Sequence, residues 1–205
     1  MKLTMKKRIL DISISLFAII LLLPLIIVTS IIVIFFLGRP VLFVQPRPGL
    51  YGKVFNLYKF RTMRNSLNSD GTLCPDGLRL TPTGAILRKF SLDELPQLYN
   101  VFIGDMSLVG PRPLLTKYMN LYTPQQALRH NVKPGITGWA QIYGRNRISW
   151  EEKLELDLWY VQHQSVWLDL KILIKTIFKV VRRDGINAEG EATSSEFLGT
   201  PPKKE

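Results

Sequence analysis

The chain has 205 residues, of which 46% are apolar, and its 27 basic and 16 acidic residues give a formal net charge of +11. This length suits one domain, or one domain with an anchor, and the apolar fraction excludes a disordered chain. One cysteine, Cys74, allows no intramolecular disulfide, and with only His130 and His163 beside it the usual zinc site is excluded. No G-x-S-x-G sequence supports a serine hydrolase.

The positive charge lies on both sides of one uncharged segment. Residues 1–11 carry a net charge of +3 and residues 39–90 carry +7, whereas residues 91–205 carry only +1. Such a distribution points to an anionic partner, either a nucleic acid or a membrane surface.

The uncharged segment, residues 12–38, favours the membrane. A straight helix of this length would measure about 40 Å, against a hydrocarbon core of about 30 Å, and the segment is too long for a signal peptide. Pro24 lies near its middle and is expected to kink the helix. Because basic residues flank both ends, two arrangements remain open: a kinked transmembrane anchor, and a re-entrant helix that enters and leaves by the same face.

After this segment the sequence indicates a compact domain with no repeats. We predict strands over 41–45 and 54–63, a loop over 65–79, helices over 83–89, 92–102, 114–122, 124–131, 150–162 and 166–183, a turn at 134–138, and an irregular tail after 185. The expected fold is α+β and mostly helical, with short strands. The expected units are a membrane-inserted helix (1–38), a catalytic domain (39–185) and a tail (186–205).

The helix predicted over 166–183 has apolar residues at three- and four-residue spacing, with Lys171, Lys175 and Lys179 among its cations. This pattern is typical of an amphipathic helix in a membrane interface. A helix packed on the core of its own domain would have the same pattern, so both interpretations stay open.

Two adjacent carboxylates, Asp93 and Glu94, are the strongest candidates for chemistry. Ser91 and Glu94 also fit an S-x-x-E capping box, with Asp93 as a favourable charge in the first turn of a helix. Pro96 would be the fifth residue of that helix, so its start is expected to be irregular.

The functional interpretation rests on the cations near these acids in the sequence: Lys59, Arg61, Arg88, Arg112, Arg145 and Arg147. Together they exceed what a helix cap needs, and they suit a polyanion such as a diphosphate. A divalent metal held by Asp93 or Glu94 would remove the repulsion between carboxylate and phosphate. One carboxylate could then attack phosphorus as a nucleophile.

Several ordered motifs resemble the bacterial sugar transferases, that is, the monotopic polyprenyl-phosphate phosphoglycosyl transferases. The motifs are RPG at 47–49, YKFRTM at 58–63, SLDELPQ at 91–97, GDMSLVGPRP at 104–113 and KPGITG at 133–138. The resemblance covers nearly the whole chain, from the apolar segment to about residue 197. It is closest to the minimal, single-domain form that opens bacterial N-linked glycan assembly.

This resemblance implies a reaction and a site. A sugar phosphate would pass from a UDP-sugar to a polyprenyl phosphate, with release of UMP. Asp93 would attack the β-phosphorus and form a covalent phosphosugar intermediate, with Mg²⁺ bound at Asp93. Glu94 would position the metal or manage a proton. The residues expected to bind phosphate are Lys59, Arg88, Arg112 and Arg145.

The resemblance also implies a cellular location and binding partners. The helix would be re-entrant in the bacterial inner membrane, with the catalytic domain on the cytoplasmic face, although Leu23-Pro24 replaces the Ser-Pro pair found at the family's bend. The donor is expected to be UDP-di-N-acetylbacillosamine, with UDP-linked N-acetylgalactosamine, galactose and glucose as alternatives. A homo-oligomer is compatible with the sequence. The competing functions are a non-catalytic, membrane-anchored assembly subunit and a basic nucleic-acid binder, and the motifs argue against nucleic acid.

Overall fold

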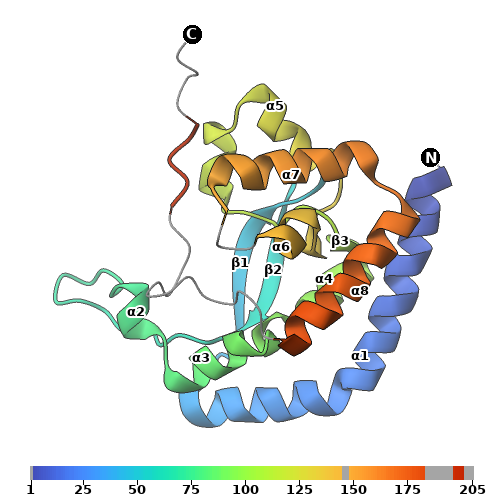
Figure 1. Ribbon diagram of the computed structural model, residues 1–205. Helices are drawn as coiled ribbons and strands as arrows, with labels where there is room; N and C mark the ends of the chain where they lie inside the picture. The colour runs from blue at the N-terminus through green and yellow to red at the C-terminus, as the bar shows by residue number, and fades with distance from the viewer. Residues whose placement is uncertain (1, 145–147, 183–195, 201–205) are drawn as a thin grey trace.

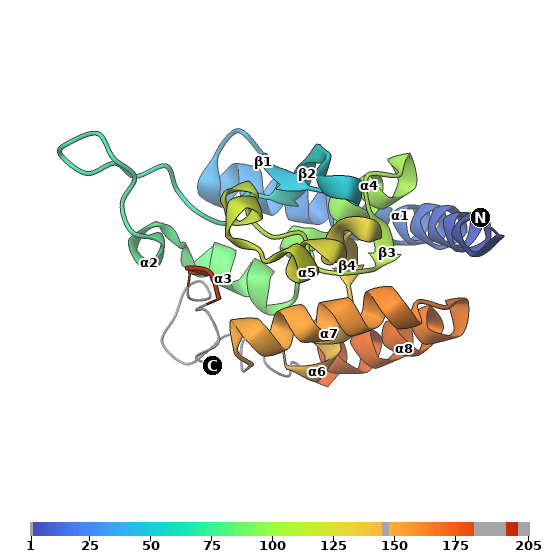
Figure 2. The same ribbon diagram turned by 90° about the horizontal axis from the view of Figure 1, so that it is seen from above.

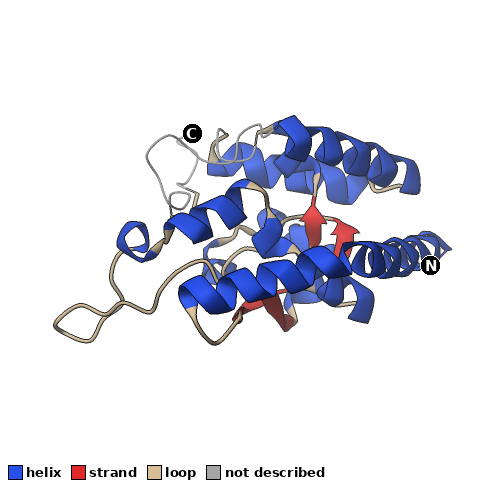
Figure 3. Ribbon diagram, turned by 90° about the horizontal axis from the view of Figure 1, so that it is seen from below, coloured by secondary structure: helices blue, strands red, loops and turns tan. Residues whose placement is uncertain are grey.

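The computed structural model describes residues 2–144, 148–182 and 196–200. The helices are α1 (Lys2–Leu37), α2 (Asp76–Arg79), α3 (Pro82–Lys89), α4 (Gln97–Ile103), α5 (Pro124–Ala127), α6 (Trp139–Tyr143), α7 (Trp150–His163) and α8 (Val166–Arg182). Turns of 3-10 helix lie at η1 (Leu50–Gly52), η2 (Leu92–Glu94), η3 (Thr116–Leu121) and η4 (Leu128–Asn131). The strands are β1 (Leu42–Pro48), β2 (Val54–Phe60), β3 (Ser107–Val109) and β4 (Gly135–Thr137). Figure 3 shows that helices predominate, as predicted.

Helix α1 is the longest element, and it bends sharply in its middle (Figure 1). Pro24 is the proline inside it, and an interior proline removes a backbone hydrogen bond and kinks a helix. The stretch Met5–Leu37 is long and apolar enough to cross a membrane, and most of it is not covered by the rest of the protein. The predicted kinked apolar helix is therefore confirmed as a structural element.

Both ends of α1 are fastened to the rest of the protein. Near its start, Arg8 donates from Nη1 to the Val101 carbonyl and from Nη2 to the Phe102 carbonyl, each at 2.6 Å. At its other end, Arg61 Nη2 donates to the carbonyls of Leu37 and Gly38. One globular unit thus holds the two ends of the bent helix.

Strands β1 and β2 form an antiparallel pair in which Val44 lies opposite Tyr58 and Pro46 lies opposite Asn56. The predicted end of the first strand at residue 45 was wrong, because β1 continues to Pro48. Prolines are tolerated here because a strand in a two-stranded sheet has one free edge, which needs no donor. The second strand ends at Phe60 rather than at 63.

Strands β3 and β4 form a short parallel pair that the sequence did not predict, and β4 replaces the turn expected at 134–138. The backbones lie very close: Gly110 N donates to the Thr137 carbonyl at 2.9 Å, and Gly135 N donates to the Pro111 carbonyl at 3.0 Å. A Cβ added at Gly110 would lie 2.3 Å from the Lys133 carbonyl oxygen, so only glycine fits. This pairing fixes the backbone just before Arg112.

Three predicted helices changed form. The helix expected over 92–102 is a 3-10 turn at Leu92–Glu94 followed by α4, which begins after Pro96. The one expected over 114–122 is 3-10 helix over Thr116–Leu121, and the one expected over 124–131 divides into α5 and η4. The predicted α7 and α8 agree with the structure to within one residue at each end. Helix α6 was not predicted, and neither was α2, which lies at the end of the segment expected to be a loop over 65–79.

The core lies between the helical layer of α7 and α8 and the β1–β2 hairpin, which Figure 2 shows on opposite sides of the molecule. Its fully buried side chains include Val101, Met106 and Ile172. Phe197, in the described part of the tail, is 1% exposed and packs against Tyr118 and Trp150. The tail was expected to be irregular; residues 196–200 have no regular structure, yet they contribute to a second apolar cluster.

Candidate active site

The carboxylates and most of the predicted cations come together from four elements. Asp93 and Glu94 lie in η2, Lys59 in β2, Arg88 in α3, and Arg112 directly after β3. Strand β2 is held against α4 by the fully buried Asn100. The Asn100 Oδ1 accepts from the Tyr58 N–H at 3.1 Å and its Nδ2 donates to the Asn56 carbonyl at 2.8 Å, which fixes the strand that carries Lys59.

Glu94 is neutralised by two cations. Its Oε1 accepts from Lys59 Nζ at 2.8 Å and from Arg112 Nη2 at 2.7 Å. Burial alone would raise the pKa of Glu94, but the charges of Arg112 and Lys59 outweigh it and hold that pKa well below the ordinary value. Glu94 is therefore ionised and fixed in place at any physiological pH.

Asp93 is in a different environment although it is the next residue. It is 7% exposed, and its Oδ2 lies 3.9 Å from Lys59 Nζ. Burial, and then the charge of Glu94, raise its pKa to about 6, against the opposing charges of Lys59, Arg88 and Arg112. Asp93 is thus a buried, comparatively basic carboxylate that is largely ionised at neutral pH.

The capping-box alternative is wrong. Ser91 has φ 54° and ψ 23°, in the left-handed region, and makes no side-chain cap hydrogen bond. A residue with a side chain rarely adopts this conformation, and such strain is concentrated at functional sites. The irregular helix start expected from Pro96 is confirmed, since Pro96 is the residue before α4 begins.

Arg88 donates from Nε to Thr62 Oγ1 at 3.1 Å, and its charge acts on Asp93. The side chain of Arg112 is 46% exposed, so it can contact a ligand while it remains paired with Glu94. Arg145 lies outside the described residues.

Within the part of the chain that the structure describes, no group of three or more His, Cys, Asp or Glu residues could hold a metal ion. A Mg²⁺ ion in proteins is often held by one or two carboxylates together with substrate phosphates, and a dyad next to cations fits that mode.

Two further features near the site were not predicted. Arg47 of β1 donates from Nη1 to the Pro113 carbonyl at 3.3 Å, and burial and then the charge of Arg112 lower its pKa to about 10. Arg129 donates to the Arg112 carbonyl at 2.8 Å while it pairs with Asp157 at 2.6 Å, and both side chains are almost fully buried. The RPG motif was a signal for Arg47, but no local pattern links Arg129 to Asp157.

The geometry defines a carboxylate pair, Asp93 buried and Glu94 partly buried, within a cluster of cations. The chain belongs to the bacterial sugar transferase family, whose model matches residues 2–183.

Relatives from several bacteria support this assignment. The uncharacterized sugar transferase EpsL of Bacillus subtilis (strain 168) is 55% identical over 194 residues, which is 95% of this chain and 96% of EpsL. The UDP-N-acetylgalactosamine-undecaprenyl-phosphate N-acetylgalactosaminephosphotransferase of Aeromonas hydrophila is 40% identical, over 83% of this chain and 42% of that protein. The UDP-glucose:undecaprenyl-phosphate glucose-1-phosphate transferase of Klebsiella pneumoniae is 42% identical, over 84% of this chain and 39% of that protein. The chain thus spans about two fifths of the last two relatives.

Proposed function

We propose that this protein transfers a sugar 1-phosphate from a UDP-sugar to undecaprenyl phosphate and releases UMP. The family membership and the names of the relatives support the general reaction. The observation that carries the mechanism is the division of roles within the dyad: Glu94 is bound to two cations, whereas Asp93 is buried with a raised pKa.

The reaction proceeds in two displacements at phosphorus. A carboxylate oxygen of Asp93 attacks the β-phosphorus of the donor, the bond to the bridging oxygen breaks, and UMP leaves with that bonding pair. An oxygen of the lipid phosphate then attacks the same phosphorus and the bond to Asp93 breaks, which restores the carboxylate. Covalent catalysis lets a soluble donor and a lipid acceptor use one phosphate pocket in turn.

The remaining residues bind and orient. Lys59 and Arg112 bridge Glu94 and the diphosphate, and Arg88 adds charge on the side of Asp93. Asp93 would hold Mg²⁺ together with the donor phosphates, and the ion would neutralise part of the phosphate charge.

The protein works at the cytoplasmic face of the inner membrane, with α1 inserted as a re-entrant helix. Because one globular unit holds both ends of α1, a membrane crossing would require that unit to contact both sides at once. The bend of α1 (Figure 1) supports the same arrangement. Helix α8 supports it too, since Trp167, Ile174 and Ile177 remain 78%, 56% and 64% exposed while Ile172 is buried in the core.

The covalent step is tested without the acceptor. Purified protein mixed with UDP-sugar and Mg²⁺ is expected to release UMP up to about one equivalent and to gain the mass of a phosphosugar, located by peptide mapping on Asp93. Asp93→Asn should abolish both at any Mg²⁺ concentration. An adduct on Glu94, or no burst in the wild type, would refute the mechanism.

The donor is identified with a panel. The relatives are named for N-acetylgalactosamine and glucose, so these UDP-sugars are compared with the galactose and di-N-acetylbacillosamine donors for UMP release.

The topology is tested with a cysteine placed at the N-terminus in a Cys74→Ser background. In intact cells an impermeant thiol reagent should leave it unmodified, and labelling would overturn the re-entrant arrangement.

A further inference from the structure

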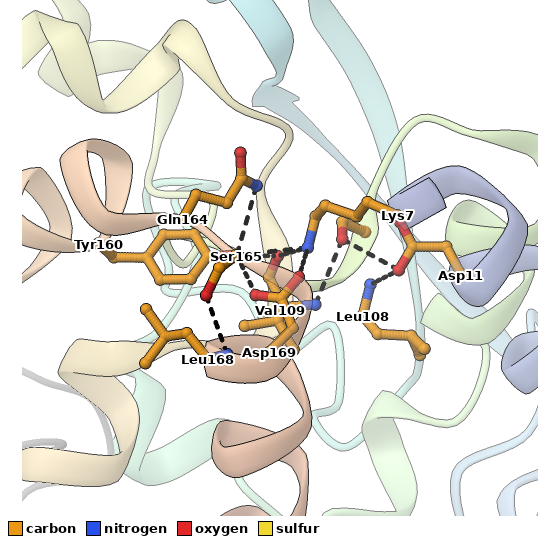
Figure 4. Close-up of polar contacts among 10 residues, drawn as sticks. Lys7, Asp11, Leu108, Val109, Tyr160, Gln164, Ser165, Leu168 and Asp169 are labelled. Atoms are coloured by element: carbon orange, nitrogen blue, oxygen red, sulfur yellow. Dashed lines mark hydrogen bonds and ion pairs between the residues drawn. The ribbon is translucent and has the colours of Figure 1, made fainter. Parts of the chain in front are cut away.

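A buried polar network joins the first turns of α1 to α7, α8 and β3 (Figure 4). Lys7 Nζ donates to Asp169 Oδ2 at 2.5 Å and to the Val109 carbonyl at 2.9 Å. The Tyr160 hydroxyl lies 2.6 Å from Asp169 Oδ1 and 3.1 Å from the same Val109 carbonyl. Residues of four elements, α1, β3, α7 and α8, therefore meet at one amine.

A second charge of α1 reaches the same strand. Asp11 Oδ1 accepts from the Leu108 N–H at 3.0 Å and from Ser107 Oγ at 3.1 Å, and Asp11 is 3% exposed. Strand β3 therefore binds α1 through three consecutive residues. This strand continues within three residues to Arg112, the cation that holds Glu94.

This network is a poor means of adding stability. The side chains of Lys7 and Asp169 are 9% and 2% exposed, so both charges lose most of their hydration. Burial raises the pKa of Asp169 even with Lys7 beside it. Replacing a buried ion pair by apolar side chains is often neutral or stabilising, whereas buried polar groups fix the register of packed elements in some proteins.

We propose that Lys7 and Asp169 are positioning residues for the acceptor step: they set α1 and α8 at a fixed depth relative to Arg112. This inference rests on the proposed function. Both helices present exposed apolar side chains, so their setting determines how far the site stands from the lipid headgroups. The acceptor phosphate is confined to that level, whereas a soluble donor reaches the site from water. An error in depth therefore affects the second displacement and spares the first.

The test is the double variant Lys7→Met/Asp169→Leu, which replaces both charged groups by apolar side chains of similar shape. Three rates are compared with the wild type in vesicles: the UMP burst without acceptor, turnover with undecaprenyl phosphate, and turnover with a water-soluble, short-chain prenyl phosphate. We expect an unchanged burst, a loss of about tenfold or more with the membrane acceptor, and near-normal turnover with the soluble acceptor.

The exposed pair Lys117–Glu196 supplies the control, since its side chains are 55% and 56% exposed. Lys117→Met/Glu196→Leu should leave all three rates unchanged. If the first double variant does not fold, Tyr160→Phe is used, because it removes one hydroxyl from the network and should cause a smaller loss with the same acceptor dependence.

Equal losses with the two acceptors, loss of the burst, or unchanged turnover with undecaprenyl phosphate would overturn the inference. If the wild type gives no burst, the covalent mechanism fails separately, and the ratio of membrane to soluble turnover still decides the positioning role.

Discussion

Replacing Asp93 by asparagine is expected to stabilise the fold while it removes the nucleophile. The pKa of Asp93 rises from 3.8 to about 6 because the carboxylate is buried next to Glu94. A shift of one pKa unit corresponds to about 1.4 kcal/mol. The ionised form of Asp93 at pH 7 is therefore disfavoured in the folded protein by about 3 kcal/mol. Asparagine has the shape of the protonated acid and never ionises. The free energy of unfolding should therefore increase by up to about 3 kcal/mol at neutral pH.

The direction of the pKa shift of Asp93 determines how the stability of the fold depends on pH. Since the folded-state pKa is raised, the folded wild type binds the proton more tightly than the unfolded chain does, and its stability falls as pH rises from about 4 to about 6. The advantage of Asp93→Asn should appear across this range and disappear below it. Thermal unfolding of both proteins in the same detergent, at neutral pH and near pH 4, measures the difference.

Glu94→Gln is the matched control because it changes the adjacent carboxyl with the opposite pKa shift. Arg112 and Lys59 hold the pKa of Glu94 low, so its charge stabilises the fold and its loss should lower the apparent Tm at neutral pH. A destabilised Asp93→Asn protein, or a stability difference that persists near pH 4, would refute the electrostatic reasoning.

Three further outcomes are expected. The kcat/KM should fall about tenfold per pH unit below about pH 6 as Asp93 becomes protonated, and a pH–rate profile without this acid limb would contradict its role as nucleophile. Arg112→Ala should cost about 2–5 kcal/mol of transition-state stabilisation, measured as kcat/KM in a protein with a normal fold; an unchanged value would remove Arg112 from the site. Phe197→Ala should lower the free energy of unfolding by about 3–5 kcal/mol in chemical denaturation with little change in KM, because Phe197 is fully buried away from the dyad.

The elements with strong periodicity were predictable, and those made by tertiary contacts were not. Helix α8 has a long amphipathic pattern, and α7 has a clear start, because Ser149 forms a capping box with Glu152. Strands β3 and β4 have three residues each, too few for any periodicity, and they exist because glycine backbones pack together.

The candidate site divides in the same way. Charges and motif order were enough to select Asp93, Glu94 and their cations, since residue type alone limits what they can bind. The different states of the two acids could not be predicted, because they depend on which oxygen meets which cation. The S-x-x-E pattern predicted that Ser91 caps a helix, but Ser91 has a left-handed backbone conformation and makes no side-chain cap hydrogen bond.

The attachment of α1 also has a consequence for biosynthesis. Asp169 follows Lys7 by 162 residues, so the ribosome completes the apolar helix long before its buried partner exists. Throughout that interval the amine of Lys7 lacks its carboxylate partner, and this end of the helix has only the bonds that Arg8 and Asp11 make to α4 and β3 and the bond from Lys7 to the Val109 carbonyl. The ion pair between Lys7 and Asp169 forms only after α8 has been made. A nascent chain that ends before residue 169 should therefore hold α1 less firmly than the finished protein does.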